Sequence, residues 1–380
     1  MLGEEADSPR GRIQLIRGLV TSVGAPDRRA TEHLEACLVC RACETACPSG
    51  VPFGRIMEGV REDLRARSGG PAWSAGRAAL DTVANARKLS VFTSLTDLAR
   101  RLGLTRLAMI VGGRLAWAAS LAPSREGGAF RGIERENADT ALFAGCVMRE
   151  AFGDTERATV RVLEHDGHIV STPEEQTCCG ALHAHAGDGE RARALARYNI
   201  DAFAGSDAKI VVNAAGCGAH LKAYGDLLEA DPAWAERAKT FAARIRDLTE
   251  VLRPRPMRSA RPLRVVYQDA CHLAHGQRIR AQPRALLRAI VGVTLVEIAD
   301  PERCCGSAGI YNLSHPEISR ALQRDKVRAI IDARPDVVVS ANPGCILQIA
   351  AGLRAASSGI RVVHLARFLG EMADGFGSRP

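Results

Sequence analysis

Short apolar runs recur in the C-terminal two thirds of the chain, and several of them end close to a cysteine. Residues 140–144 lead through Gly145 into Cys146, and residues 264–268 lead within three positions into Cys271. Compact apolar runs of this length are typical of buried β-strands. We therefore expect a strand at each place, with a cysteine just beyond its carboxyl end.

The pattern around these two runs occurs twice. In each copy a helical stretch and a short strand (residues 167–171 and 294–298) come next, then a Cys-Cys-Gly triplet, a second helix, and a strand (residues 208–213 and 336–340) that leads into a Gly-Cys pair. Such self-similarity predicts duplicated structural units. The cysteines of the repeat are Cys146, Cys178, Cys179 and Cys217 in the first copy and Cys271, Cys304, Cys305 and Cys345 in the second.

Strands and helices that alternate in this way favour a parallel sheet flanked by helices. Binding sites in such sheets form at the carboxyl ends of the strands, which is where these cysteines lie. Thiolates at this density repel one another unless a cation neutralises them, so we assign all eight as ligands of a metal or a cluster. The spacing does not decide between an iron-sulfur cluster and zinc. Glycines such as Gly180 and Gly306 are expected to bring backbone amides close to sulfur.

A third group of cysteines lies near the N-terminus, between stretches of helical periodicity at residues 12–20 and 53–66. Its spacing is that of bacterial ferredoxins and predicts a [4Fe–4S] cluster, whereas a structural zinc site would need two ligand pairs with a longer spacer. The fourth cysteine of such a run binds the other cluster in two-cluster ferredoxins. Here it closes its own cluster, or a partner supplies a ligand, or a further run is missing. The run is Cys37, Cys40, Cys43 and Cys47, followed by Pro48.

The predicted fold class is α/β, with a small α-helical ferredoxin-type domain followed by two duplicated modules that contain parallel sheets. Between them, amphipathic stretches with glycine breaks predict a helical connector in which we find no chemistry. The expected limits are residues 1–60 for the helical domain, 61–135 for the connector, 136–256 for the first module and 257–380 for the second.

Histidines near the repeated cysteines are further candidates, although any one of them is more often a surface residue or a neighbour of a ligand than a ligand. His220 is the strongest, because it follows Cys217 by three positions. Its counterpart in the second copy is Gln348, a poor ligand, so the two copies need not bind identically. The other candidates are His183, His185, His272 and His275.

Composition narrows the class of protein further. The 380 residues carry a net charge of +8, but the charge is spread thinly, aromatic residues make up only 4%, and no stripe of alternating basic and stacking residues occurs, so a nucleic-acid partner is not expected. Attraction to an acidic partner subunit or to a membrane face stays open. The acidic start is not that of a secretory signal, and no uncharged apolar run is long enough for a membrane span. Twelve cysteines in short-spaced sets favour metal binding in the cytoplasm.

Together, the ferredoxin run and the two Cys-Cys-Gly modules resemble the iron-sulfur subunit of bacterial glycolate oxidase (glycolate dehydrogenase) over essentially the whole chain. More distant similarity extends to iron-sulfur subunits of lactate-utilisation and anaerobic glycerol-3-phosphate dehydrogenase systems and to the Cys-Cys-Gly subunit of heterodisulfide reductase. The resemblance implies that a first cluster run should precede the Asp-Ser-Pro-Arg-Gly-Arg stretch, which here lies at the start. The stretches that carry it are residues 7–12, 37–50 and 342–348.

The resemblance implies a function. It predicts an electron-transfer subunit of an oxidoreductase that acts on CH–OH donors, with no catalytic residue of its own, which relays electrons from a flavin-containing subunit toward quinone. The flavin is expected on another chain, because no Gly-x-Gly-x-x-Gly fingerprint follows a strand here. The expected location is the cytoplasm, with peripheral association at the inner face of the cell membrane left open.

Three alternatives stay open at this point. The donor could be lactate or glycerol 3-phosphate rather than glycolate. The chain could itself be a thiol or disulfide reductase with a catalytic Cys-Cys-Gly cluster, although the family of heterodisulfide reductases ends each module in Cys-x-x-Cys and this chain has His220 and Gln348 at those positions. A zinc-stabilised scaffold without redox chemistry is the third.

Overall fold

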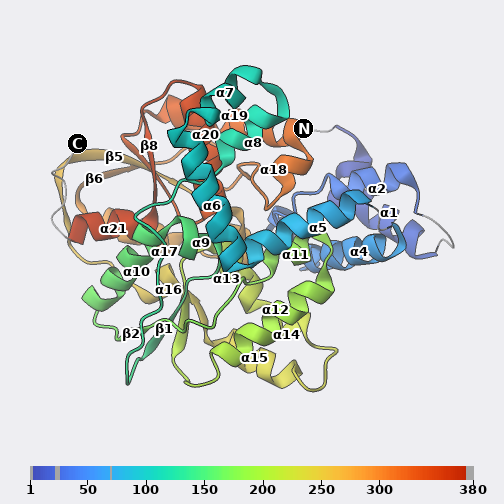
Figure 1. Ribbon diagram of the computed structural model, residues 1–380, viewed down its shortest axis with the longest axis horizontal. Helices are drawn as coiled ribbons and strands as arrows, with labels where there is room; N and C mark the ends of the chain where they lie inside the picture. Colours follow the sequence, from blue (N-terminus) through green and yellow to red (C-terminus); the bar gives the residue numbers. More distant parts are fainter. Residues whose placement is uncertain (1–2, 22–25, 69–70, 374–380) are drawn as a thin grey trace.

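The computed structural model describes residues 3–21, 26–68 and 71–373. In Figure 1 an N-terminal group of helices lies to one side of the body, which contains two sheets with helices around them. Each sheet has four parallel strands. The predicted α/β class, with parallel sheets in two duplicated modules, is therefore confirmed.

The N-terminal helices enclose a small core beside the first cysteine run. Leu34, Met57 and Leu64 are completely or almost completely buried there, together with Cys37. The helices predicted at residues 12–20 and 53–66 are present and slightly longer. The elements are η1 (Glu5–Asp7), α1 (Pro9–Thr21), α2 (Arg28–Glu35), α3 (Ala42–Ala46) and α4 (Phe53–Ser68).

The connector consists of four helices, and each break between them has a local cause. The side chain of Asn85 caps the start of α6 by accepting a hydrogen bond from the amide of Lys88. Gly103 and Gly112 have φ angles of +74° and +80°, which glycine adopts without strain. None of the helices in the described ranges is long and apolar enough to cross a membrane. The helices are α5 (Pro71–Ala84), α6 (Ala86–Arg101), α7 (Leu104–Val111) and α8 (Gly113–Leu121).

The first module is built on a sheet with the strand order β2-β1-β3-β4. Its strands are β1 (Thr140–Phe143), β2 (Val170–Ser171), β3 (Lys209–Val212) and β4 (Ile245–Asp247). Phe143 is paired with Val212, so the central strands end level with each other. The helices are α9 (Val147–Ala151), α10 (Gly153–His165), α11 (Ala181–Ala186), α12 (Gly189–Ala202), α13 (Ala215–Lys222), α14 (Tyr224–Leu227), α15 (Ala235–Arg244) and α16 (Leu248–Val251).

The second module repeats this order as β6-β5-β7-β8. Its strands are β5 (Arg258–Gln268), β6 (Val291–Val296), β7 (Val337–Ser340) and β8 (Arg361–His364). Gln268 is paired with Ser340, the equivalent of the Phe143–Val212 pair. Its helical elements are η2 (a π-helical turn, His272–Gly276), α17 (Ala281–Arg288), α18 (Tyr311–Ser314), α19 (Pro316–Ala333), α20 (Pro343–Ala355) and α21 (Leu365–Ala373).

The two modules share one hydrophobic core. A single buried cluster contains Leu163 and Val211 of the first module and Val266, Val338 and Phe368 of the second. Helix α21 of the second module packs on α10 of the first, and the two lie side by side in Figure 1. The carboxyl ends of the sheets also meet, since the amide of Ala215 donates to the carbonyl of Ala341 at 3.0 Å. The modules are thus held with their cysteine-bearing edges close together.

Two details differ from the expected segment limits. Residue 60, the expected end of the N-terminal domain, lies inside α4, which continues to Ser68. Before β1, Ile133 already pairs with Thr172 of the first module. The pattern of apolar residues did not reveal these limits, because a continuous amphipathic helix can cross from one domain to the next.

Candidate metal-cluster sites

The four cysteines of the first module come together at the carboxyl edge of its sheet. Cys146 lies just beyond the end of β1, and Cys217 lies in the first turn of α13, after β3. The thiol of Cys178 interacts with those of Cys146 and Cys179, and Cys179 in turn interacts with Cys217. The predicted grouping of Cys146, Cys178, Cys179 and Cys217 is what the structure shows in space.

The second module places its cysteines in the same way. Cys304 interacts with Cys271 and with Cys305, and Cys305 interacts with Cys345, which lies in the first turn of α20. Three of these thiols, at Cys304, Cys305 and Cys345, are buried. The order of contacts is therefore the same in both copies, as expected from a duplicated unit.

Backbone amides approach sulfur at the two Cys-Cys-Gly triplets, as the glycines predict. The amide of Gly180 donates to Sγ of Cys178 at 3.5 Å, and the amide of Gly306 donates to Sγ of Cys304 at 3.4 Å. Both glycines have φ near +90°, and a Cβ at Gly306 would lie 2.6 Å from the carbonyl oxygen of Ser319. Such N–H···S contacts stabilise negative charge on sulfur and tune the potential of a bound cluster.

Without a cation several of these thiols resist ionisation, while hydrogen bonds from Cys146 and Cys179 lower the pKa of Cys178. Contact with Cys304 and burial raise the pKa of Cys271 well above its usual value, and burial raises the pKa of Cys40 to about 12. A thiolate in such a place needs a positive neighbour, which iron or another metal ion supplies. The donor set thus fits a bound metal centre better than a set of free thiols.

The N-terminal cysteines divide into three and one. Cys37, Cys40 and Cys43 are close enough for their charges to affect one another. Cys47 is the C-cap of α3, one helical turn after Cys43, and the backbone amides of Val51, Ser49 and Gly50 lower its pKa. The first three thiols therefore interact with one another through their charges, whereas the fourth is stabilised by backbone amides.

The N-terminal run lies next to the second module. Cys40 is near enough to Cys271 for the charge of that thiol to raise the pKa of Cys40, and Cys40 in turn raises the pKa of Cys304. Thr45 of α3 is hydrogen-bonded through Oγ1 to Nδ1 of His275 in η2 at 3.0 Å. Two of the cysteine sets thus share a border, which is the arrangement that electron transfer between centres requires.

Arg61 of α4 locks the N-terminal run in place from within the core. Its guanidinium donates to the carbonyls of Cys37 at 2.5 Å and Glu35 at 3.1 Å, and across the domain border to the carbonyl of His185 at 2.7 Å. Tyr311 of the second module adds a hydrogen bond to the carbonyl of Ala36 at 2.9 Å. Neither Arg61 nor Tyr311 is marked by any motif, so neither was predicted from the sequence.

Several of the candidate histidines meet where the three folded parts touch. His185 is hydrogen-bonded to Glu58 of α4 at 2.7 Å, and its ring lies 5.1 Å from that of His272 and 6.4 Å from that of His220 between ring centres. Burial alone would raise the pKa of Glu58, but the His185 hydrogen bond and the nearby histidines lower it to about 2. Burial lowers the pKa of His220 to about 4, so this ring is neutral at pH 7. Its buried Nε2 atom has no hydrogen-bond partner in the described part of the chain.

Gln348, the counterpart of His220, has a structural role instead. Its side chain donates to Ser319 Oγ at 2.9 Å and accepts from Asn312 at 3.4 Å, inside the helical layer of the second module. The expected difference between the two copies is therefore visible: one presents an unpartnered imidazole beside its thiols, and the other an amide that is already hydrogen-bonded. His183 is completely buried, and His275 belongs to a separate ion-pair network.

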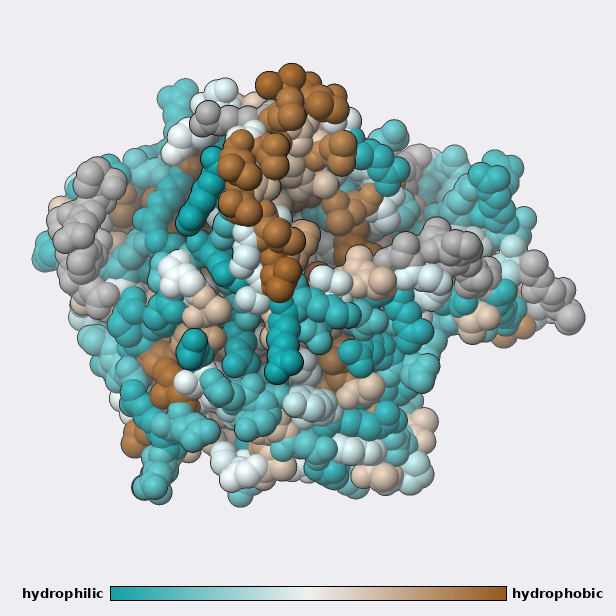
Figure 2. Space-filling view, viewed as in Figure 1, coloured by the Kyte–Doolittle hydropathy of each residue, from teal (hydrophilic) through white to brown (hydrophobic). Residues whose placement is uncertain are grey.

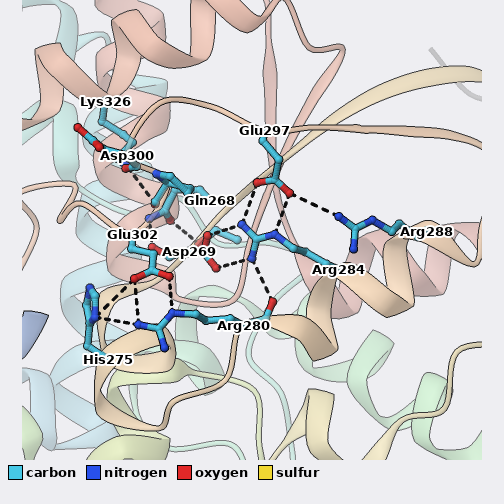
Figure 3. Close-up of polar contacts among 12 residues, drawn as sticks. Gln268, Asp269, His275, Arg280, Arg284, Arg288, Glu297, Asp300, Glu302 and Lys326 are labelled. Atoms are coloured by element: carbon cyan, nitrogen blue, oxygen red, sulfur yellow. Dashed lines mark hydrogen bonds and ion pairs between the residues drawn. The ribbon is translucent and has the colours of Figure 1, made fainter. Parts of the chain in front are cut away.

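That network fixes the loop that carries Cys271 (Figure 3). Asp269, which is almost completely buried, accepts two hydrogen bonds from Arg284 at 2.8 and 2.6 Å, and Arg284 also contacts Glu297 at 2.8 Å. A paired guanidinium of this kind satisfies the buried carboxylate. The first module has Ala144 at the position of Asp269, so it lacks the equivalent of the buried Asp269–Arg284 ion pair.

A buried lysine faces the second set of thiols. Lys326 is 3% exposed and donates to the carbonyls of Asp300 at 2.9 Å and Pro301 at 3.0 Å (Figure 3). Burial lowers its pKa, while the nearby Cys305 and Cys345 act in the opposite direction. A cation near thiolates favours the anionic form of a thiolate-bound centre. The helical pattern of α19 gave no signal for it, since lysine is ordinarily exposed.

Among the described residues, no three His, Cys, Asp or Glu side chains converge closely enough to hold a single metal ion. A cubane iron-sulfur cluster binds each thiolate at a different iron, so its ligands do not have to point at one centre. The row of contacting thiols in each module is compatible with such an extended cofactor. Chemically, rows of thiols that hold such clusters suit one-electron relay.

The fold and the sites define an iron-sulfur protein of the electron-transfer class, with a ferredoxin-type run and two duplicated cysteine-rich modules. A family model described as "Cysteine-rich domain" (CCG) matches residues 140–222 and 265–350. A protein described as "Probable glycolate oxidase iron-sulfur subunit" from Bacillus subtilis (strain 168) is 34% identical over 395 residues, which covers 97% of this chain and 89% of that protein. The chain belongs to the family of glycolate oxidase iron-sulfur subunits.

Other relatives agree with this assignment. The "Glycolate oxidase iron-sulfur subunit" of Escherichia coli (strain K12) is 33% identical over 93% of this chain and 86% of its own length. "Lactate utilization protein A" of Exiguobacterium sp. is 32% identical, over 61% of this chain and 97% of that protein. A crystal structure of a hypothetical protein from Helicobacter pylori superposes with a TM-score of 0.59 at 10% identity, covers 97% of this chain and 67% of that one, and supports the fold alone. The resemblance seen in the sequence is confirmed.

Proposed function

We propose that this chain takes electrons from a flavin-containing dehydrogenase subunit that oxidises glycolate, or a similar small 2-hydroxy acid, and relays them toward quinone. The relatives' names supply glycolate and, more distantly, lactate as donors. The observation that supports relay most directly is the contact of the N-terminal run with the second module, where Cys40 lies beside Cys271 and Cys304. Catalysis at carbon then belongs to the flavin subunit, and the clusters carry single electrons.

For the ligands, we infer that Cys37, Cys40 and Cys43 hold one [4Fe–4S] cluster, which needs a fourth ligand from elsewhere. Cys47 would serve a second cluster, as in two-cluster ferredoxins, where the fourth cysteine of each run binds the other cluster. Each module would hold a further cluster through its own four thiols: Cys146, Cys178, Cys179 and Cys217 in the first, and Cys271, Cys304, Cys305 and Cys345 in the second.

The domain limits can be restated with the helices in view. We place the end of the N-terminal domain after Ser68, where α4 ends, and the start of the first module shortly before Ile133. The limit near residue 256 lies between α16 and β5. We propose a location in the cytoplasm, at the inner face of the membrane that contains the quinone.

The alternative of a thiol or disulfide reductase is less favoured. Such enzymes in the similar heterodisulfide reductase family use a fifth thiolate in each module, and the corresponding positions here hold a neutral buried imidazole, His220, and a hydrogen-bonded amide, Gln348. Zinc in one of the modules would still be compatible with relay through the others.

The test combines metal analysis with a reduction experiment. The chain is purified anaerobically, alone and with its flavin subunit, and iron, zinc and acid-labile sulfide are measured for the wild type and for Cys37→Ser. We expect several clusters per chain, an electron paramagnetic resonance signal that glycolate induces only when the flavin subunit is present, and partial loss of that signal in Cys37→Ser. Zinc without sulfide, or glycolate-dependent dye reduction that does not change when this chain is removed, would refute the proposal.

A further inference from the structure

A ridge of exposed apolar side chains runs along the connector. Ten of the sixteen large exposed apolar residues in the described ranges lie between residues 91 and 115, so they are concentrated in one segment of the chain. Figure 2 shows this ridge as a continuous brown band that rises to the top of the molecule over α6, α7 and α8. We call it the apolar ridge. Exposed patches of this kind mark interaction sites rather than ordinary surface.

The ridge has a helical repeat on α6. Val91, Leu95, Leu98 and Leu102 follow one another at intervals of four, three and four residues, which places them on one face of the helix. All four are at least half exposed. The opposite face of α6 is the packed one, because Leu89 and Thr93 are buried against the body. The exposed stripe is therefore a second apolar face, in addition to the one that folding uses.

The α7–α8 hairpin extends the ridge. Leu104, Leu107, Ile110, Val111 and Leu115 are all more than half exposed, with Ile110 at 82%. The hairpin is attached to the body at its far end, where Trp117 donates to the carbonyl of Asn312 at 2.6 Å. In Figure 2 the brown surface over α7 and α8 forms the top of the molecule and stands out from it. The apolar residues thus lie on a convex projection, not in a groove.

Positive charge accompanies these apolar residues. Residues 86–121 contain six basic side chains and only one acidic side chain, Asp97, which is itself paired with Arg100 at 3.4 Å. Arg87, Lys88 and Arg101 are exposed beside the stripe of α6. The net charge of the chain, +8, is therefore contributed in large part by this segment. Exposed aliphatic side chains next to basic ones match the interface of an anionic lipid bilayer.

A protein partner would fit this surface less well. Cores of protein interfaces are enriched in tyrosine, tryptophan and methionine, whereas the apolar ridge is leucine, isoleucine and valine with a single aromatic residue, Phe92. Its convex form also suits entry into a soft lipid surface. Helices α7 and α8 have 8 and 9 residues, and a bilayer span needs about 20. The two would therefore lie in the interface plane.

We propose that the apolar ridge of α6–α8 inserts into the surface of an anionic phospholipid bilayer and so attaches the chain to the membrane. The attachment deepens the proposed delivery of electrons to quinone and rests on that proposal for its purpose, although its evidence is independent. It would hold the cluster-bearing body at the depth where a membrane-dissolved quinone is accessible.

The experiment is vesicle sedimentation with the purified, cluster-loaded chain. Vesicles of phosphatidylglycerol and phosphatidylethanolamine are compared with vesicles of phosphatidylcholine, for the wild type, Leu107→Glu/Ile110→Glu, and Tyr198→Glu as a matched control. Tyr198 lies on α12 and is as exposed as Leu107, at 53% against 55%. Iron content and thermal unfolding show that each variant is folded.

The wild type and Tyr198→Glu are expected to bind the anionic vesicles and to bind phosphatidylcholine more weakly. The double variant should bind at least about tenfold more weakly, since each buried aliphatic side chain contributes on the order of one factor of ten or more. The proposal is overturned if the double variant binds vesicles as well as the wild type does, or if the wild type does not bind them. It is also overturned if the double variant loses binding to the flavin subunit while its vesicle binding is unchanged.

The proposed function can fail separately. Glycolate-dependent reduction of a water-soluble dye by the complex should be the same in the double variant and the wild type, because Leu107 and Ile110 are exposed side chains of α7, a helix that contains no cysteine. If the wild type binds vesicles but shows no such reduction, the electron-transfer proposal fails and the membrane attachment stands. If reduction is normal and no variant affects membrane binding, the attachment fails alone.

Discussion

A buried acid between the two modules offers a sharp test of the structure. Glu156 of α10 is completely buried, and burial raises its pKa from 4.5 to about 8, against a hydrogen bond from Asn213. The Nδ2 of Asn213 donates to Oε1 of Glu156 at 3.1 Å, while Oε2 has no hydrogen-bond partner within the described residues. At neutral pH the folded protein therefore holds a protonated carboxyl here. Replacement by glutamine keeps the shape and removes the titration.

The magnitude follows from the two pKa values. In the unfolded chain Glu156 ionises near pH 4.5, and in the folded chain near pH 8. Between these values the unfolded state holds fewer protons, so the free energy of unfolding falls as the pH rises and is lowest above pH 8. One pKa unit corresponds to about 1.4 kcal/mol, so Glu156→Gln should be more stable than the wild type by about 3 kcal/mol at pH 7 and about 5 kcal/mol above pH 8.

The assay is thermal unfolding of the cluster-loaded wild type and variant as a function of pH. Burial lowers the pKa of His364 to about 4, so this histidine destabilises the fold only as the pH falls below 6.5. Measurements above about pH 6.5 therefore avoid its titration. Between pH 6.5 and pH 8 the stability difference between the two proteins should grow by roughly 2 kcal/mol.

A matched control is Glu236→Gln on α15, where the side chain is exposed and paired with Lys239. It should leave the pH dependence unchanged. If Glu156→Gln is less stable than the wild type at pH 8, or if the difference between them does not grow with pH, then Glu156 is ionised or hydrated in the folded protein and the burial described above is wrong.

Three other predictions concern the cluster sites. Arg61→Met removes the donors to the carbonyls of Cys37 and Glu35. Because each buried carbonyl left unpaired costs about 1–3 kcal/mol, the N-terminal run should lose its iron before the two modules do. Iron content and paramagnetic resonance measure this loss. Asp269→Asn leaves Arg284 partly unpaired and should lower the free energy of unfolding by about 3 kcal/mol, seen in thermal unfolding. Cys47→Ser should retain the resonance signal that Cys40→Ser abolishes, because the fourth cysteine of a ferredoxin run serves the other cluster.

Each of these has its own control. Arg67→Met, on the same helix as Arg61 but paired with Asp63 at the surface, should keep its iron. Glu371→Gln at the half-buried pair with Arg361 should change stability by less than about 1 kcal/mol, in contrast to Asp269→Asn, because Glu371 is far less buried than Asp269. Equal loss of signal in Cys47→Ser and Cys40→Ser would mean that Cys47 does close the same cluster and that the run rearranges when iron binds.

The sequence alone determined the local elements and the chemistry of the cysteines. Strands at residues 140–144 and 264–268 end at cysteines because apolar runs of that length bury themselves in a sheet, and the sheets are parallel because helices alternate with strands. The duplication was visible because equal spacing survives in the chain. These features depend on neighbours within a few residues or on a repeat, and both can be counted along a sequence.

The tertiary structure decided which distant residues meet. Cys40 lies beside Cys271, and Glu58 pairs with His185, across separations that no periodicity encodes. The same holds for Arg61, which looks like any surface arginine of a helix until its carbonyl partners are seen. Burial, and with it the pKa values of Glu156 and Lys326, arises only when elements pack and exclude water.

The connector shows the limit most clearly. Its amphipathic pattern predicted helices, and helices are what form, but the pattern could not tell an apolar stripe that packs on the body from one that stays exposed. In α6 both kinds occur on one helix, with Leu89 buried and Leu98 exposed. Hydrophobicity is a property of each residue and can be read along the chain; exposure depends on what the rest of the fold places over it, so only the tertiary structure revealed the apolar ridge.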